Sequence, residues 1–345
     1  MTLASQSNEF TEYVRLLARG RKGSRDLTRE EAKQAMSLLL ADKALPEQIG
    51  AFFMLMRVKE ETSDELAGFA EACFDLWKYS DESNNSQSLN ADIIWPSYAG
   101  KRRQPLWYIL SMQLLNDAGY SILCHGASGH IGAGAETRQY LVEAFEYFNM
   151  PIASSKQDAQ EQINTSKITY LACEHLSPHF KPWLMTKQTL GLRSPINTLL
   201  RLIAPQSAKG MQSVFHPNYA QVHQQACHAL GKEAVIFKGE GGEIEANPER
   251  KVQAFYGAQS DSNEPEIILN TQSHYELKEE QPSFEAIATL WQSEDAENTQ
   301  PYGYLAVIYT TALGLKLMNH EMNLDKAIEQ AKSLWQQRNT SLFKK

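Results

Sequence analysis

The stretch IIWPSYAGKRRQPLW (residues 93–107) has the layout of a strand, a tight turn and the start of a helix. Such a turn aims backbone N–H groups at one point and favours an anion. Catalytic phosphate loops contain several glycines because the backbone must approach the ligand closely. This turn contains Gly100 and then three adjacent cations, Lys101, Arg102 and Arg103. We therefore predict that the cations contact a long phosphate backbone; the alternative is a solvated basic loop.

Strand and helix patterns alternate from this stretch toward the C-terminus, whereas the preceding residues show helical patterns alone. The strand patterns are ADIIW, YSILCHG, KITYLAC, QSVFHP and EAVIFKG. Strands that alternate with helices favour a largely parallel, doubly wound sheet. In the first part, Thr28 with Glu31 and Thr62 with Glu65 have the spacing of helix capping boxes. The predicted fold class is α/β: a small all-helical domain plus a larger doubly wound α/β domain with a mostly parallel sheet.

Both predicted domains are discontinuous. Two helical patterns follow each other without a strand before residue 205, so we expect them to return to the N-terminal helices. The helical domain then comprises 1–79 and 177–204, and the α/β domain comprises 90–176 and 205–345. The polar segment between 80 and 90 lacks periodicity and is predicted to be a linker.

The composition is that of a globular protein with unevenly distributed charge. The 345 residues carry a net charge of −8, but the segment 233–300 holds fifteen acidic and four basic residues. The rest holds 29 basic and 26 acidic residues, and can form basic patches. The N-terminus does not resemble a signal peptide and no apolar run approaches the roughly 20 residues of a membrane span, so we expect a cytoplasmic protein with no membrane partner. The cysteines are predicted to be reduced core residues: Cys73, Cys124, Cys173 and Cys227.

A second basic stretch, ARGRKGSRDL (residues 18–27), contains four cations within seven residues. They are Arg19, Arg21, Lys22 and Arg25. Its two glycines favour a loop between helices, so we predict a further contact with a phosphate backbone. A solubilising loop is the alternative.

Three other stretches contain candidate binding residues. In LCHGASGHIGAGAET (residues 123–137), His125 could donate to a phosphate, and Arg138 is predicted to lie one turn into the next helix. In GLRSPINTLLRL, Arg193 and Asn197 are four residues apart on one predicted helix face and could hold a carboxylate or phosphate, although a charged surface ridge explains them equally.

The third stretch, KGEGGEIEANPE, follows a strand and contains Glu240, Glu243 and Glu245. Clustered carboxylates in this position can bind Mg²⁺ together with a diphosphate. An acidic turn without a metal is the alternative.

Several of these motifs resemble the anthranilate phosphoribosyltransferase family (glycosyltransferase family 3). The resemblance covers nearly the whole chain and rests on MRVKEETSDELAGFAEA, HG after the second strand, GLRSPINTLLRLIAP, QSVFHPNY and LGKEAVIFKGEGGEIEANP. It implies the nucleoside phosphorylase/phosphoribosyltransferase-like fold and a homodimer formed by the helical domains. It also implies that phosphoribosyl diphosphate and magnesium bind in the cleft between the domains.

The departures from the family pattern fall mainly on the phosphoribosyl diphosphate side. The family's GTGGD signature and its Asn-x-Ser-Thr motif are absent from PSYAGKRRQPLWYILS, and Ile244 and Glu245 stand where an Asp-Glu pair binds magnesium. The resemblance leaves a remnant substrate cleft and one weak magnesium ligand, Glu245. The cleft residues are Tyr98, Gly100, His125, Gly126, Arg193 and Asn197.

The motifs are similar to a divergent, YbiB-like branch of the family, which implies nucleic-acid binding without known transferase activity. We therefore expect a homodimer that binds DNA, and possibly RNA, nonspecifically and requires no cofactor. One alternative is a phosphoribosyltransferase that uses phosphoribosyl diphosphate and Mg²⁺ with an altered acceptor. Another is a metabolite sensor that retains the cleft but not the chemistry.

Overall fold

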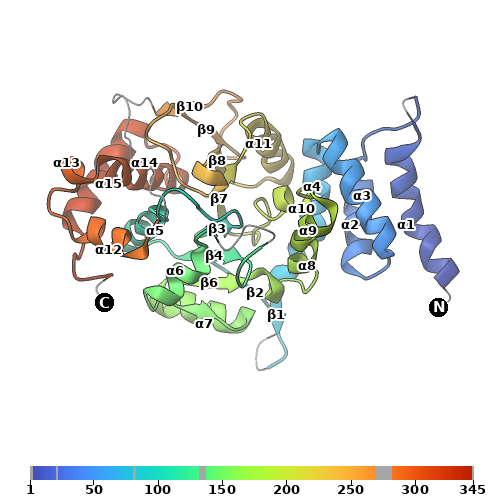
Figure 1. The fold of residues 1–345 in the computed structure, drawn as a ribbon, viewed down its shortest axis with the longest axis horizontal. Coiled ribbons are helices and arrows are strands. Elements are labelled where there is room, and N and C mark those ends of the chain that lie inside the picture. The colour runs from blue at the N-terminus through green and yellow to red at the C-terminus, as the bar shows by residue number, and fades with distance from the viewer. Residues whose placement is uncertain (1–2, 21, 81–82, 132–136, 269–281, 344–345) are drawn as a thin grey trace.

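The computed structural model describes residues 3–20, 22–80, 83–131, 137–268 and 282–343. It contains a helical part at one end of the molecule and an α/β part at the other (Figure 1). The helical part includes the N-terminus, and the α/β part includes the C-terminus. The predicted fold class, a small helical domain beside an α/β domain with a mostly parallel sheet, is confirmed.

The helical part is built from four N-terminal helices and three short helices from the middle of the chain. They are α1 (Leu3–Ala18), α2 (Arg29–Leu40), α3 (Pro46–Lys59), α4 (Ser63–Ala72), α8 (Phe180–Met185), α9 (Lys187–Leu190) and α10 (Ile196–Leu199). The side chains of Phe53 in α3 and Trp183 in α8 meet edge-on, with 5.9 Å between ring centroids. The segment 177–204 thus packs beside the N-terminal helices.

Helices α2 and α4 begin where their capping residues predict. Thr28 accepts a hydrogen bond from the Glu31 N–H, and the Glu31 carboxylate accepts one from the Thr28 N–H. Thr62 and Glu65 form the same reciprocal pair at the start of α4. Each box satisfies backbone N–H groups that a helix start leaves without partners.

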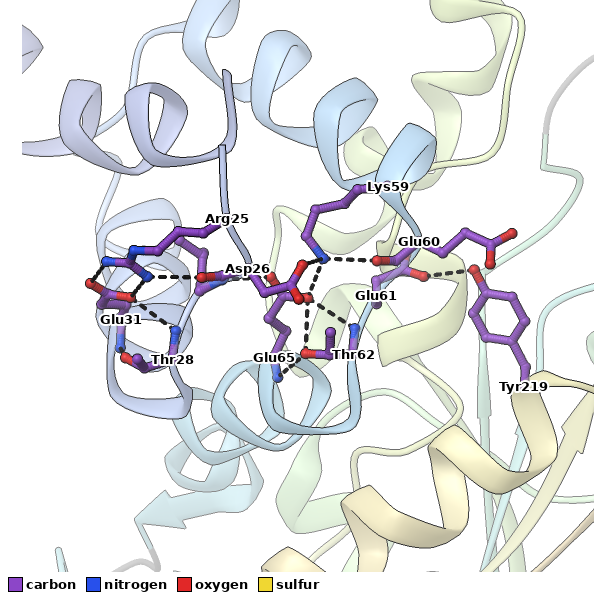
Figure 2. Close-up of polar contacts among 11 residues, drawn as sticks. Arg25, Asp26, Thr28, Glu31, Lys59, Glu60, Glu61, Thr62, Glu65 and Tyr219 are labelled. Atoms are coloured by element: carbon purple, nitrogen blue, oxygen red, sulfur yellow. Dashed lines mark hydrogen bonds and ion pairs between the residues drawn. The ribbon is translucent and has the colours of Figure 1, made fainter. Parts of the chain in front are cut away.

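The buried Glu65 carboxylate also joins separate segments of the helical part (Figure 2). Its oxygens accept the Leu27 N–H at 2.8 Å and the Lys59 ammonium at 2.6 Å. The same ammonium lies 2.8 Å from the Asp26 carboxylate. The end of the loop between α1 and α2 is therefore bound to the turn between α3 and α4.

The central sheet has eight strands in the order β10-β9-β8-β7-β3-β4-β6-β5. Strands β8 to β5 in this order are parallel, and β9 and β10 extend the edge in antiparallel pairing. The strands are β3 (Ile93–Ser97), β4 (Ile122–Gly126), β5 (Ile152–Ala153), β6 (Ile168–Ala172), β7 (Lys209–Val214), β8 (Ala234–Lys238), β9 (Val252–Tyr256) and β10 (Glu266–Ile268). The carboxyl ends of β3, β4 and β7 therefore lie at the same edge, where open α/β sheets bind ligands.

Helices cover both faces of the sheet. They are α5 (Tyr108–Asp117), α6 (Leu141–Tyr147), α7 (Lys156–Ser166), α11 (Tyr219–Leu230), α12 (Phe284–Gln292), α13 (Ala296–Thr299), α14 (Pro301–Met318) and α15 (Leu324–Gln337). Ile93 and Trp95 of β3 belong to a core formed with α5, α6, α12, α14 and α15. Ile94 faces the opposite core, which includes α7, α11 and the helical part. This burial on both faces explains the nearly continuous apolar run of the strand.

Two regions differ from the sequence prediction. The predicted linker contains an antiparallel pair of short strands, β1 (Lys78–Ser80) and β2 (Ser86–Ser88), whose polar side chains do not produce a strand-like apolar pattern. Strands β5, β9 and β10 were not predicted. All four cysteines are free and buried, as predicted. None of the described helices is both long enough and apolar enough to cross a bilayer.

The close contact between α2 and α4 gives a test of the fold. At Gly68, an added Cβ would lie 2.1 Å from the Arg29 carbonyl oxygen and 2.9 Å from the Ala32 Cβ. We expect Gly68→Ala to lower the free energy of unfolding by about 1–3 kcal/mol through overpacking. Urea denaturation followed by circular dichroism measures this change.

The matched control is Gly50→Ala in α3, where no described atom lies within 4 Å of the added Cβ. Because alanine favours a helix more than glycine does, this variant should gain up to about 1 kcal/mol of stability. Equal behaviour of the two variants would contradict the close packing of α2 on α4.

Candidate functional site

The turn after β3 binds an anion that the chain itself supplies. The N–H groups of Ala99 and Gly100 donate to Glu243 Oε1 at 2.6 and 2.7 Å, and the Tyr108 hydroxyl donates to Oε2 at 3.2 Å. We call these three donors the anion seat. Glu243 is fully buried, and Gly100 has a φ of +64°, which glycine adopts readily. The sequence predicted an anion-binding turn correctly but assigned the anion-binding role to cationic side chains; here the backbone holds a carboxylate.

Lys101 is buried, contrary to the predicted contact with nucleic acid. Its ammonium pairs with the Glu245 carboxylate and donates to the Pro105 carbonyl at 2.6 Å. The other Glu245 oxygen accepts the Tyr108 N–H at 3.1 Å, at the start of α5, where the helix dipole favours negative charge. Burial raises the pKa of Glu245 to about 7, and Lys101 opposes this shift. With 2% of its surface exposed, Lys101 cannot reach a phosphate chain.

The acidic turn does not fit a magnesium site. The Glu243 and Glu245 carboxylates bind the anion seat and Lys101, and Glu240 pairs with Arg250 at 3.0 Å. A buried ammonium next to Glu245 repels a divalent cation. No group of three His, Cys, Asp or Glu side chains suited to a metal occurs within the described residues. The role of Glu245 as a metal ligand is therefore not supported by its surroundings.

Two cavities share Phe215 in their lining. Besides Arg201, which is buried and donates to backbone carbonyls, five arginines line them. They are Arg57 in α3, Arg102 and Arg103 after β3, Arg138 before α6 and Arg193 before α10. One cavity of about 110 Å³ is lined by Arg57 and Arg193. Another of about 250 Å³ is lined by the other three arginines, and Phe215 borders both. We call the five arginines and Phe215 the arginine cleft.

The charge of the arginine cleft is not neutralised by ion pairs. None of its five arginines forms a salt bridge with a carboxylate in the described part of the chain. Burial lowers the pKa of Arg193, and the nearby charges of Arg138 and Arg57 lower it further. The cleft thus concentrates positive charge although the whole chain is acidic.

The smaller cavity also contains polar groups. The Ser194 hydroxyl oxygen is buried and has no hydrogen-bond partner among the described residues. The Tyr219 hydroxyl, from α11, donates to the buried Glu61 carboxylate at 3.0 Å (Figure 2). Burial raises the pKa of Glu61. The cavity therefore offers cationic and hydroxyl groups to a ligand.

The residues of the predicted remnant cleft do not all lie at one site. Arg193 and Asn197 line the smaller cavity together, although α10 begins at Ile196, so they do not share a helix face. His125 is fully buried and bonds the Tyr98 hydroxyl through Nδ1 at 2.7 Å. Burial lowers the pKa of His125 to about 3, so the ring is neutral at physiological pH. This burial does not favour the predicted phosphate contact of His125, which lines neither cavity of the cleft.

Two glycines and Arg138 support the turn itself. A Cβ on Gly126 would lie 2.3 Å from the Ser97 carbonyl oxygen, so this glycine allows β3 and β4 to pack closely. The Arg138 guanidinium donates to the Gly100 carbonyl at 2.9 Å while also lining the larger cavity. Arg138 precedes α6, which begins at Leu141, instead of lying one turn into it.

The basic loop after α1 is separate from the arginine cleft, because it lines neither cavity. Arg19 and Lys22 are exposed, and Arg21 lies outside the described residues. Arg25 binds both oxygens of the Glu31 carboxylate at 2.6 and 2.7 Å, which satisfies much of its charge. Of this loop, Arg19 and Lys22 remain candidates for a phosphate contact.

Sequence reasoning missed Arg57 and Phe215. Arg57 lies in an apolar helical pattern and is brought to the cleft by tertiary packing. Phe215 was included in a predicted strand, but β7 ends at Val214 and the phenylalanine ring is 51% exposed. The following His-Pro pair was the available signal that the strand ends here.

Comparisons with known proteins agree with the fold. Residues 11–76 match the family model described as "Glycosyl transferase family, helical bundle domain". The uncharacterized protein YbiB of Escherichia coli is 24% identical over 245 residues, which cover 70% of this chain and 74% of YbiB. An anthranilate phosphoribosyltransferase of Ralstonia pickettii is 25% identical over 220 residues, 63% of this chain and 62% of that protein.

A solved structure shows the same architecture. The anthranilate phosphoribosyltransferase from Thermus thermophilus superimposes with a TM-score of 0.71 and 15% identity, and the match covers 94% of each chain. Residues 11–76 thus match the helical bundle domain of the glycosyl transferase family, and the chain as a whole has the fold of the anthranilate phosphoribosyltransferases.

Proposed function

We propose that the chain binds nucleic acid, DNA or RNA, without sequence preference through the arginine cleft. The observation that carries this proposal is the distribution of charge. The five arginines lack carboxylate partners among the described residues, whereas the anion seat already holds Glu243. Arginines spread over a surface bind a phosphate chain with little demand on geometry, and their charge releases counterions from it.

The shape of the cleft also favours a chain of phosphates over one compact ligand. Its two cavities, of about 110 and 250 Å³, are each smaller than the roughly 300–1,000 Å³ of small-molecule pockets. Phe215 lines both cavities, so neighbouring groups of one strand can enter them. The homodimer that the family resemblance implies would carry two such clefts.

Phosphoribosyl transfer is the second candidate, favoured by relatives that are named anthranilate phosphoribosyltransferases. In this alternative, Arg193 and Asn197 would bind the acceptor in the smaller cavity. Two observations weigh against it. Glu243 occupies the backbone donors that a diphosphate would need, and Lys101 stands beside the carboxylate that would bind Mg²⁺.

The salt dependence of binding tests the first proposal. We expect Arg102→Ala with Arg103→Ala to weaken binding of a labelled oligonucleotide, measured by fluorescence anisotropy between 50 and 300 mM KCl. Each lost phosphate contact should reduce the slope of log K against log salt by about 0.7–0.9, so the double variant should lose about 1.4–1.8.

The control for this experiment is the double variant Lys326→Ala with Lys332→Ala, which removes the same charge from exposed positions of α15. Its slope should equal that of the wild type. If both double variants retained the wild-type slope, Arg102 and Arg103 would not contact the nucleic acid.

The Glu243→Ala variant tests whether the carboxylate excludes phosphate from the anion seat. Without it, two buried N–H groups lose their acceptor, and we expect the free energy of unfolding to fall by about 1–3 kcal/mol. Pyrophosphate should then raise the melting temperature of the variant by more than that of the wild type, because in the variant it can also replace the carboxylate at the anion seat. Differential scanning fluorimetry measures both effects.

Glu249→Ala is the control, because it removes an exposed carboxylate near the same turn that lines neither cavity of the cleft and does not contact the anion seat. It should respond to pyrophosphate as the wild type does. Strong stabilisation of the wild type by phosphoribosyl diphosphate with Mg²⁺ would instead favour the transferase alternative.

A further inference from the structure

We infer that Phe215 stacks on one base of a single-stranded nucleic acid, and that the arginine cleft therefore prefers single strands to duplexes. The inference rests on the proposed function and specifies its ligand. An aromatic ring between phosphate-binding arginines is the arrangement by which proteins hold unpaired strands without reading their sequence.

The exposure of Phe215 is the first observation. The ring is 51% exposed, directly after the buried Val214 at the end of β7. It is the one phenylalanine among the five large apolar side chains that are exposed in the described residues. None of the other four lines a cavity of the cleft. The exposed apolar surface of Phe215 and the unpaired arginines thus line the same two cavities, as a base and its phosphate require.

Arg193 and His216 contact the Phe215 ring and hold it in place for stacking. The Arg193 guanidinium carbon lies 5.8 Å from the centre of the Phe215 ring, in a cation–π contact. The His216 ring meets Phe215 edge-on, with 5.0 Å between centroids and 78° between planes. A base that stacks on the exposed ring would extend a stack that already contains a guanidinium. Because every base has a π-face, this contact tolerates any sequence.

Groups suited to phosphate line both cavities that Phe215 borders. Toward the smaller cavity these are Arg57 and Arg193, with the buried Ser194 hydroxyl that lacks a partner in the described chain. Toward the larger cavity they are Arg102 and Arg103. One carboxylate lines each cavity, and each already has a partner: Glu61 accepts the Tyr219 hydroxyl, and Glu240 pairs with Arg250. One nucleotide on Phe215 would therefore have cations for the phosphates on either side of it.

A duplex fits this arrangement less well. Its bases are already stacked on one another, and to expose one of them costs a few kcal/mol. A duplex can therefore contact the outer arginines through its phosphates, but it cannot use the Phe215 ring.

The test compares Phe215→Ala with the wild type on three labelled polyanions: a single-stranded oligo(dT), a duplex of the same length, and inorganic polyphosphate, which lacks bases. We expect the variant to lose about 5- to 100-fold in affinity for the single strand, the range that one stacked base contributes. Affinity for the duplex and polyphosphate should change less than twofold. Phe215→Trp should restore single-strand binding, and its added fluorescence should be quenched when the base stacks.

Ile267→Ala is the matched control, because it removes another exposed apolar side chain, 40% exposed on β10 and outside both cavities of the cleft. It should bind all three polyanions as the wild type does. If Phe215→Ala bound the single strand as tightly as the wild type, or lost polyphosphate binding equally, stacking would be refuted while nucleic-acid binding stood. If the wild type bound none of the three, both proposals would fall.

Discussion

The buried Glu243 carboxylate is the contact on which the geometry of the cleft depends. A buried carboxylate is costly unless hydrogen-bond donors surround it, and here the donors come from residues more than 130 positions away in the sequence. The contact therefore holds the acidic turn against the carboxyl end of β3. Arg201, itself buried, reinforces the turn by donating to the Ser213 carbonyl of β7 at 3.0 Å and to the Gly242 carbonyl.

The position of the acidic turn has a direct consequence for the arginine cleft. Gly242 has a φ of +89°, and a Cβ there would lie 3.4 Å from the Phe215 ring. Gly242 of the acidic turn thus lies beside the Phe215 ring. The Glu243 carboxylate accepts backbone N–H groups and the Glu245 carboxylate pairs with Lys101, so neither forms an ion pair with the cleft arginines. The acidic turn therefore fills the anion seat with Glu243 and leaves the arginines of the cleft without ion-pair partners.

Much of the fold could be predicted from local patterns, because capping boxes and alternating strands and helices depend on neighbouring residues. Thr28, Thr62 and the β3 run are examples. The site was harder to predict, because it depends on contacts between distant segments. Three adjacent cations after β3 look equivalent in the sequence, yet Lys101 turns inward to Glu245 while Arg102 and Arg103 face solvent.

The role of Glu243 was hard to predict for the same reason, because it depends on contacts with a distant segment. Its spacing in an acidic stretch fits a metal ligand, and only the folded chain shows that it accepts backbone N–H groups instead.

The most direct test of whether Glu243 excludes a diphosphate is a crystal structure of the wild type grown with phosphoribosyl diphosphate and Mg²⁺. We predict that Glu243 still accepts hydrogen bonds from Ala99 and Gly100, with no diphosphate at these groups. A diphosphate bound to both amides, with the Glu243 side chain displaced, would contradict the account.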